Sequence, residues 1–253
     1  MITRRAFLQL AGLTISFFVF SPVYGSRPCK VPVLMYHNIA FQDDEYTIAP
    51  PFFAAQMEVL YSEGLQPVFI NELAAGQSIG NPVVITFDDG YTSFGDYVFP
   101  LLQMYEFKAT VNLIGKYMNS FSRIDGNRLS WDECRYMLRS GLVEFGCHTY
   151  DLHNVFLLQR QQLSTEAIAA DLQRFQKRYE QELGRAAEVL AWPYGIYNSM
   201  MITEGKKAGF KYMLTSSRMP FSLDRHSFFE IPRINIMNTL NMRMFKNAIG
   251  LTS

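Results

Sequence analysis

The sequence has few cysteines and no excess of charge. Only three cysteines occur among 253 residues, Cys29, Cys134 and Cys147, and no C-x-x-C pair is present. An odd count leaves at least one thiol unpaired, so a disulfide framework is excluded and one bridge is the most the chain could form. Lys and Arg (23) balance Asp and Glu (23), which argues against a nucleic-acid-binding protein. We expect Cys134 and Cys147 to be small buried apolar residues.

The sequence also lacks repeats, low-complexity segments and linkers. No glycine-rich phosphate loop follows any expected strand, so a nucleotide site is not expected. With 49% apolar residues, the composition is that of an ordinary globular protein. Aromatic residues reach 15%, which suits a carbohydrate-binding surface and is explained equally well by a large core. We expect one domain, over residues 26–253.

The N-terminal segment reads as an export signal rather than part of the fold. Arg4 and Arg5 precede an apolar stretch at residues 10–20, and Gly25 offers a small residue for cleavage. The paired arginines predict a twin-arginine signal over residues 1–25, and a general secretory signal or an uncleaved membrane anchor are the alternatives. The apolar stretch is shorter than the ~20 residues that a membrane span needs. The pattern predicts an exported protein, periplasmic or extracellular.

Apolar strands alternate with amphipathic helices along the rest of the chain. This order predicts an α/β fold in which helices cover a parallel sheet, and about seven such units favour a closed barrel over an open sheet. The expected strands are residues 31–36, 68–70, 83–88, 109–114, 142–147, 188–192, 212–215 and 231–234. The expected helices are residues 53–62, 94–105, 130–138, 164–183 and 199–208, with one more at the C-terminus.

The strand at residues 83–88 ends in two adjacent carboxylates, Asp88 and Asp89, followed by Gly90. On an α/β scaffold the chemistry is placed at the C-terminal ends of strands. Neighbouring side chains on an extended chain point in different directions, so one aspartate can bind a metal while the other handles protons. Asp-Gly is also ordinary turn chemistry, which is the structural alternative for this dipeptide.

Three of the four histidines follow expected strand ends: His37, His148 and His153. A single histidine in such a place is more often structural, and a histidine pair in a loop can simply be exposed. Together with a carboxylate, however, two histidines form a three-ligand set for a catalytic ion. Zn²⁺ is the first choice, and Fe²⁺, Co²⁺ or Ni²⁺ also suit these ligands. Such an ion lowers the pKa of a bound water and polarises a carbonyl.

Three segments resemble the motifs of the polysaccharide deacetylases, the NodB-homology family or carbohydrate esterase family 4. Residues 86–90 (TFDDG) resemble the first motif, 148–153 (HTYDLH) the second and 192–195 (WPYG) the third. Residues 31–37 (VPVLMYH) and 231–234 (IPRI) resemble the branch of exported poly-β-1,6-N-acetylglucosamine deacetylases. The resemblance covers essentially the whole chain after the leader, and its first two motifs are the specific ones.

This resemblance implies a distorted (β/α)7 barrel and a divalent metal held by Asp89, His148 and His153. The spacing of the two histidines is five residues, as in the branch just named, rather than the four that are common in the family. The ion held by these three residues would be Zn²⁺ as the first choice, with Co²⁺, Ni²⁺ or Fe²⁺ as alternatives.

The resemblance also implies the catalytic groups. Asp88 would be the general base, and the backbone N–H of Tyr194 would help to hold the oxyanion. The order of motifs looks circularly shifted, and no L-x-H motif occurs near the C-terminus, so the catalytic acid would be His37. One departure bears directly on activity: Ala191 and Trp192 stand where the third motif often carries an Arg that orients the base.

The function that this resemblance implies is metal-dependent removal of N-acetyl groups from a GlcNAc-containing polysaccharide, with release of acetate. An exopolysaccharide is the expected substrate, exopolysaccharide export machinery is a candidate partner, and nucleic acid is not expected. Two other classes stay open: a non-catalytic polysaccharide-binding protein on the same scaffold, and an amidase or esterase for small molecules. Sugar-stacking candidates are Tyr150, Tyr194, Tyr197 and Trp192, and for Trp192 core packing is the favoured interpretation.

Overall fold

The structure is a computed structural model that describes residues 30–76, 79–120, 126–154, 163–216 and 219–251. The expected export signal at residues 1–25 and Cys29 lie outside the described residues. Within the described ranges, no helix combines the length and the hydropathy needed to cross a bilayer. Cys134 and Cys147 are buried free thiols, which confirms their predicted role.

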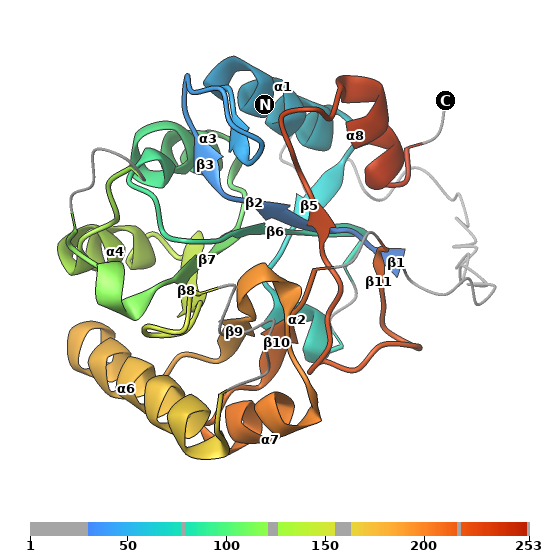
Figure 1. The fold of residues 1–253 in the computed structure, drawn as a ribbon. Helices are drawn as coiled ribbons and strands as arrows, with labels where there is room; N and C mark the ends of the chain where they lie inside the picture. The colour runs from blue at the N-terminus through green and yellow to red at the C-terminus, as the bar shows by residue number, and fades with distance from the viewer. Residues whose placement is uncertain (1–29, 77–78, 121–125, 155–162, 217–218, 252–253) are drawn as a thin grey trace, which may run out of the picture.

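A curled parallel sheet forms the centre of the molecule (Figure 1). Its strands lie side by side in the order β10-β9-β8-β7-β6-β2-β12, β5 pairs with β6, and each pairing is parallel. Their bounds are β2 (Val33–Tyr36), β5 (Leu65–Pro67), β6 (Asn81–Phe87), β7 (Ala109–Leu113), β8 (Val143–Cys147), β9 (Val189–Ala191), β10 (Tyr212–Leu214) and β12 (Ile234–Asn235). Two short pairs flank the sheet: β1 (Lys30–Val31) with β11 (Phe221–Ser222), and β3 (Asn38–Ile39) with β4 (Thr47–Ile48).

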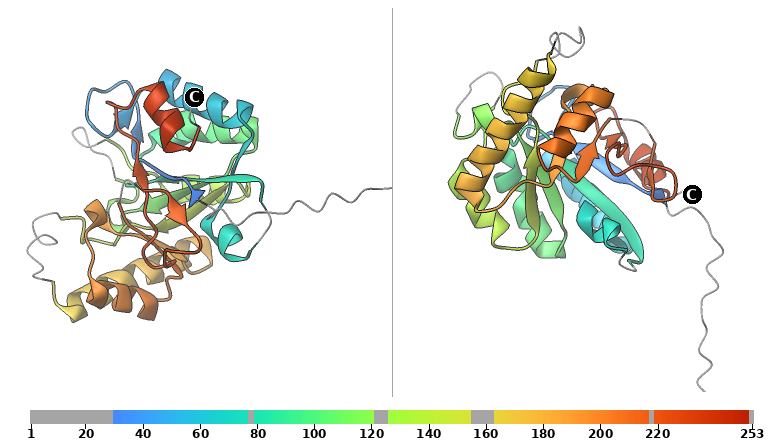
Figure 2. Two further views of the ribbon diagram at one scale, coloured as in Figure 1. Left: turned by 90° about the vertical axis from the view of Figure 1, so that its right-hand side faces the viewer. Right: turned by 90° about the horizontal axis from the view of Figure 1, so that it is seen from below.

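The helices lie outside the strands. In Figure 1, α1, α3, α4, α6 and α7 follow one another around the sheet, and the left view of Figure 2 places α1, α3 and α8 on the side opposite α6 and α7. Their bounds are α1 (Pro50–Ser62), α2 (Ile70–Ala74), α3 (Phe99–Tyr105), α4 (Trp131–Leu138), α6 (Thr165–Leu183), α7 (Ser199–Lys207) and α8 (Met242–Ala248). A π-helical turn, η2 (Phe94–Val98), precedes α3, and η3 (Gly115–Tyr117) and η4 (Pro193–Gly195) are 3-10 turns.

The segment at residues 228–233 connects the two edges of the sheet. On one edge it hydrogen-bonds to β10, where the N–H of Met213 donates to Phe228 O (2.8 Å) and the N–H of Thr215 donates to Ile231 O (2.8 Å). It then runs into β12, which pairs with β2 at the other edge. The predicted distorted barrel in a single domain is therefore confirmed, and the carboxyl ends of its parallel strands gather at one end.

The alternating direction of side chains along β6 explains where the Asp88 side chain points. Val83, Ile85 and Phe87 belong to the large core under the helices, whereas Val84 belongs to a second, smaller cluster with Val33 of β2. Successive side chains of a strand point to opposite faces. Asp88 therefore continues the face of Val84, whose cluster includes residues of β2, β9, β10 and α2, and this register carries its carboxylate to the cavity at the carboxyl ends of the strands.

Two predicted elements differ from the structure. Residues 68–70 are not a strand: β5 ends at Pro67, and Ile70 already begins α2, because the Glu72 carboxylate accepts a hydrogen bond from Phe69 N–H (2.8 Å) and caps the helix. Of residues 231–234, only Ile234 lies in a regular strand, and Ile231 forms an isolated bridge to Leu214.

Candidate metal centre and active site

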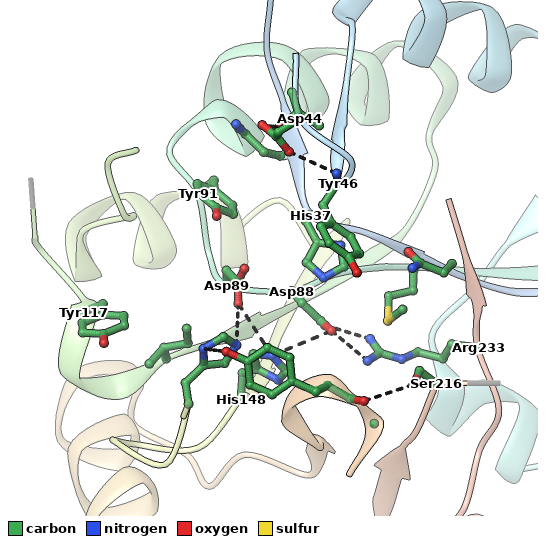
Figure 3. Close-up of a pocket in the computed structure, with 18 of the residues that line it drawn as sticks. His37, Asp44, Tyr46, Asp88, Asp89, Tyr91, Tyr117, His148, Ser216 and Arg233 are labelled. Carbon is green, nitrogen blue, oxygen red and sulfur yellow. Dashed lines mark hydrogen bonds and ion pairs between the residues drawn. The ribbon is translucent and has the colours of Figure 1, made fainter. Parts of the chain in front are cut away.

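A cavity of about 560 Å³ opens at the carboxyl ends of the strands (Figure 3). Its walls come from the ends of β2, β6, β8 and β9, and from residues beside β10 and β12. All six residues with a predicted catalytic or metal-binding role line it: His37, Asp88, Asp89, His148, His153 and Tyr194. Segments more than 150 residues apart in the chain thus meet at one site, as the parallel topology requires.

Asp89, His148 and His153 present three ligand atoms within 4.8 Å of one another. Asp89 Oδ1 lies 3.6 Å from His148 Nε2 and 3.4 Å from His153 Nε2. Ligand atoms held tetrahedrally at about 2.0–2.2 Å from an ion are separated by roughly 3.3–3.6 Å, so these distances fit. Asp89 Oδ1 is buried and has no hydrogen-bond partner among the described residues, which leaves this oxygen available for a cation.

Hydrogen bonds fix both imidazoles with Nε2 toward Asp89. His148 Nδ1 lies 2.8 Å from Ala191 O, so Nδ1–H donates to this carbonyl and Nε2 is directed at Asp89. His153 Nδ1 lies 3.2 Å from the Tyr194 hydroxyl. Burial, and next the neighbouring His148, lower the pKa of His153 to about 4, so this imidazole is neutral, as a ligand must be. The three residues therefore fit a divalent ion by distance and orientation.

Asp88 is fully buried and held by a guanidinium. Arg233 Nη1 and Nη2 each lie 2.7 Å from a different Asp88 oxygen, and Asn112 Nδ2 donates a further hydrogen bond to Asp88 Oδ1 (2.8 Å). Burial raises the pKa of Asp88, but the charge and the hydrogen bonds of Arg233 outweigh it and hold this pKa well below its usual range. Asp88 Oδ2 is the oxygen that faces the metal ligands, 3.9 Å from His148 Nε2.

Arg233 fills the role that the third motif leaves vacant. Its side chain is 1% exposed, and it also donates to Thr215 O (2.9 Å) and to Thr86 Oγ1 (3.2 Å), so its planar group is fixed on both sides. The absence of an Arg near Trp192 therefore does not leave Asp88 without an orienting cation. Arg233 lies in the 231–234 segment that carries part of the family resemblance, but its role did not follow from the sequence.

His37 lines the same cavity, across Asp88 from His148 (Figure 3). Its ring packs against Tyr46, with 5.0 Å between centroids, and its Nδ1 is buried with no partner among the described residues. Burial lowers the pKa of His37, and the negative charges of Asp89 and Asp88 oppose that shift. A positioned imidazole of this kind can exchange a proton with a bound molecule.

Tyr194 sits on a strained turn beside His153. Its φ of 57° lies in the left-handed region, which is costly for a residue with a side chain. Two contacts hold the turn: Ser216 Oγ lies 3.4 Å from Tyr194 O, and Gly195 packs so closely on Ser216 that an added Cβ would lie 1.9 Å from Oγ. The turn therefore fixes the direction of the Tyr194 backbone at the cavity.

The aromatic candidates divide by exposure. Tyr194 is 49% exposed. Tyr46 (43%) and Tyr117 (38%) are also partly exposed and line the same cavity. Trp192 is only 1% exposed and belongs to the core, which confirms the interpretation favoured for it, although it also borders the cavity.

Known proteins resemble the chain over this region and beyond it. The family described as "Polysaccharide deacetylase" matches residues 75–213, a span that contains both aspartates and both cavity histidines of the metal cluster. A poly-β-1,6-N-acetyl-D-glucosamine N-deacetylase of Staphylococcus aureus (strain MSSA476) is 27% identical over 212 residues, which are 81% of this chain and 73% of that protein.

Two solved structures resemble the fold. The Streptococcus pyogenes deacetylase PplD, in complex with acetate, superposes with a TM-score of 0.77 and 21% identity over 88% of this chain and 99% of that one. IcaB from Ammonifex degensii gives a TM-score of 0.74 and 24% identity over 88% of this chain and 96% of that one. Because both identities are below 25%, these two structural matches establish the fold alone.

Proposed function

The chain belongs to the polysaccharide deacetylase family, and from this premise we propose that it hydrolyses N-acetyl groups on a GlcNAc-containing polysaccharide and releases acetate. One observation carries the proposal. An Asp-His-His set suited to a divalent ion lies beside a second carboxylate, Asp88, whose pKa is held well below its usual range, at one cavity. A protein that only bound sugars would need no proton acceptor beside a metal site.

The divalent ion, when bound by Asp89, His148 and His153, supplies Lewis acidity that lowers the pKa of a water and polarises the acetamide carbonyl. Asp88 accepts the proton of that water. Its lowered pKa favours the ionised form but also makes Asp88 a weak base. Asp88 would therefore depend on the Lewis acidity of the ion that Asp89, His148 and His153 would hold, which would make the water a stronger acid.

Two groups act on the other atoms of the amide. The backbone N–H of Tyr194 donates a hydrogen bond to the oxyanion that develops on the carbonyl oxygen. His37, protonated, donates to the nitrogen of the leaving amine. Burial lowers the pKa of His37, which makes its protonated form a readier donor, and the negative charges of Asp89 and Asp88 oppose that shift.

The substrate in this proposal is a polymer of β-linked GlcNAc, with poly-β-1,6-N-acetylglucosamine as the first candidate. The Staphylococcus aureus relative, whose name gives that substrate, supports this choice. The exposed rings of Tyr46, Tyr117 and Tyr194 at the cavity also support it, because aromatic faces with a polar tip suit sugar rings. Zn²⁺ is the proposed ion.

Acetate release from β-1,6-linked and β-1,4-linked GlcNAc oligomers of increasing length tests this function, with and without added Zn²⁺, Co²⁺ and Ni²⁺. We expect metal-dependent release that increases with oligomer length, and the preferred linkage identifies the polymer. Equal rates on a monomeric acetamide would favour a small-molecule amidase. Binding of oligomers with no release under any metal would favour a non-catalytic binding protein.

The proposal includes export to the periplasm or the outside of the cell, where exopolysaccharide export machinery is a candidate partner. The motif at residues 1–25, with Arg4 and Arg5 before an apolar stretch, supports it. N-terminal sequencing of the protein recovered from the periplasm and the medium tests it. A protein that keeps residue 1 and stays in the cytosolic fraction would contradict export.

A further inference from the structure

The loop between the two histidine ligands has a backbone conformation that needs outside support. His148 follows β8, and the chain must reverse within five residues to bring His153 back to Asp89. The reversal passes through Thr149, whose φ of 66° is left-handed. A β-branched residue is a genuine outlier in this region, and such strain persists only where the surroundings hold it in place.

A buried carboxylate on α6 holds this loop from one side. Asp171 is 8% exposed and lies on the face of α6 that carries the apolar stripe of Ile168, Leu172 and Phe175. Its two oxygens accept hydrogen bonds from consecutive backbone N–H groups, from Tyr150 to Oδ2 (2.7 Å) and from Asp151 to Oδ1 (2.8 Å). Hydrogen bonds to an ionised acceptor are short and strong, as these are.

The start of η3 holds the same loop from the other side. The N–H groups of Gly115 and Lys116 donate to Thr149 O (3.1 Å) and Tyr150 O (2.9 Å). Gly115 lies so close to the Tyr150 ring that an added Cβ would be 2.5 Å from it. The backbone N–H and C=O of Tyr150 are therefore both engaged, one by each side of the clamp.

We propose that Asp171 is a positioning residue for the metal site, which fixes the 150–151 backbone so that His153 meets Asp89 and His148 at ligand distance. The hydrogen bonds of Asp171 go to the backbone of Tyr150 and Asp151, so it acts on the ligands through the loop. The inference rests on the proposed function in one respect, that the three ligands bind a divalent ion. A carboxylate buried in an otherwise apolar helix face costs free energy, and orientation of this loop is what that carboxylate provides.

Direct metal titration of the full chain tests the inference without any measurement of activity. Asp171→Asn keeps the shape but turns one acceptor into a donor that faces a backbone N–H. We expect the Kd for Zn²⁺, measured by competition with a chromophoric chelator, to rise about 10–100-fold, the range for groups that orient metal ligands. Added Zn²⁺ should restore binding, and Asp171→Glu, which keeps both acceptor oxygens, should recover part of the affinity.

Glu182→Gln is the matched control. Glu182 is another partly buried carboxylate of α6 and is bonded to Arg135, on the side of α4 rather than the loop. Its substitution should lower stability without a change in the Kd for Zn²⁺. If Asp171→Asn does not fold, Gly115→Ala strains the same loop from the opposite side and should weaken Zn²⁺ binding in the same way.

The outcomes separate the two claims. An unchanged Kd in folded Asp171→Asn, or in Gly115→Ala where the first variant fails to fold, would overturn the positioning role and leave the proposed function intact. A wild-type chain that binds no Zn²⁺, Co²⁺ or Ni²⁺ would instead overturn the metal site itself. A fall in melting temperature at constant Kd would show that Asp171 serves the fold alone.

Discussion

The two ends of the parallel strands handle charge in opposite ways. At the carboxyl ends, Asp88 and His148 are each 2% exposed and are held by fixed partners, and Asp89 keeps an oxygen with no hydrogen-bond partner in the part of the chain that the structure describes. At the amino ends, charged side chains form ordinary ion pairs near solvent, such as Lys108 with Glu72 and Lys211 with Glu188. The carboxyl ends therefore carry groups whose arrangement serves a bound ion and substrate, and the amino ends carry groups that serve stability.

Backbone strain is also concentrated near the site at the carboxyl ends of the strands. Five residues other than glycine have a positive φ among the described residues, and three of them adjoin the site: Asp89 (72°), Thr149 (66°) and Tyr194 (57°). Strain at these positions is maintained by neighbours such as Ser216 and Asp171, which hold the turns in place. Substitutions at the two ends should accordingly separate activity from stability.

Loss of a metal ligand should have the largest effect at the carboxyl ends. His153→Ala removes one of three ligands, so the ion is lost and turnover should fall by several orders of magnitude, because no group remains to acidify the water. Elemental analysis of the purified variant measures occupancy. Full occupancy would contradict the ligand role of His153.

Loss of the base should come next. Asp88→Asn leaves the ligands in place but cannot accept a proton, so acetate release should fall ~10²–10⁴-fold while the metal content stays at the wild-type level. Lower acetate release with an unchanged metal content distinguishes a general base from a metal ligand. Unchanged turnover in this variant would remove Asp88 from the mechanism.

A conservative change at Arg233 should have a smaller effect. Arg233→Lys keeps the charge but cannot form two parallel hydrogen bonds to Asp88, so the carboxylate is no longer fixed. Turnover should fall about 10²-fold, as for a misplaced catalytic group, with metal content preserved. Arg225→Lys is the control, since Arg225 is exposed and lies 3.9 Å from Asp224. Equal activity in both variants would show that Arg233 serves only to neutralise Asp88.

At the amino ends, Glu144→Gln should change stability with pH and leave turnover unchanged. Burial raises the pKa of Glu144 to about 7, although Thr110 Oγ1 donates a hydrogen bond to it. The folded state therefore holds a proton that the unfolded chain releases near pH 4.3, and wild-type stability falls as the pH rises from about 4 to about 7.

Urea unfolding at pH 5 and pH 8 measures this effect. In Glu144→Gln this fall should be absent. The free energy of unfolding of the variant, relative to wild type, should therefore rise by about 1–3 kcal/mol from pH 5 to pH 8. Lys211→Met, at a solvent-exposed ion pair of the same end, keeps Glu144 and should show the same fall in stability as wild type. A large loss of acetate release in Glu144→Gln would break the division between the two ends.

Local patterns predict most of the scaffold and the metal cluster. The apolar run before Asp88, the stripe of α6 and the cap at Ser164 each act within a few residues, so the sequence displays them directly. Parallel strands then bring their carboxyl ends together without further information. This is why His37, from the first long strand, and His148 were expected at one site.

The supporting groups were not predictable in the same way. Arg233 bonds to a residue 145 positions away, and no local pattern encodes such a contact. Asn112 and Asp171 leave a weak signal, because each is a polar residue on a buried face of an apolar strand or helix. Their partners depend on packing between elements, which a single sequence does not display.

The most direct test of the account is a titration of the chelator-treated protein with Zn²⁺, during which acetate release from a GlcNAc oligomer is followed. Wild type should release no acetate without the ion and should reach full activity at one ion per chain, while Asp88→Asn should bind the ion equally well and stay nearly inactive. Release that needs no ion, or that is undiminished in Asp88→Asn, would contradict a metal-dependent deacetylase at this site.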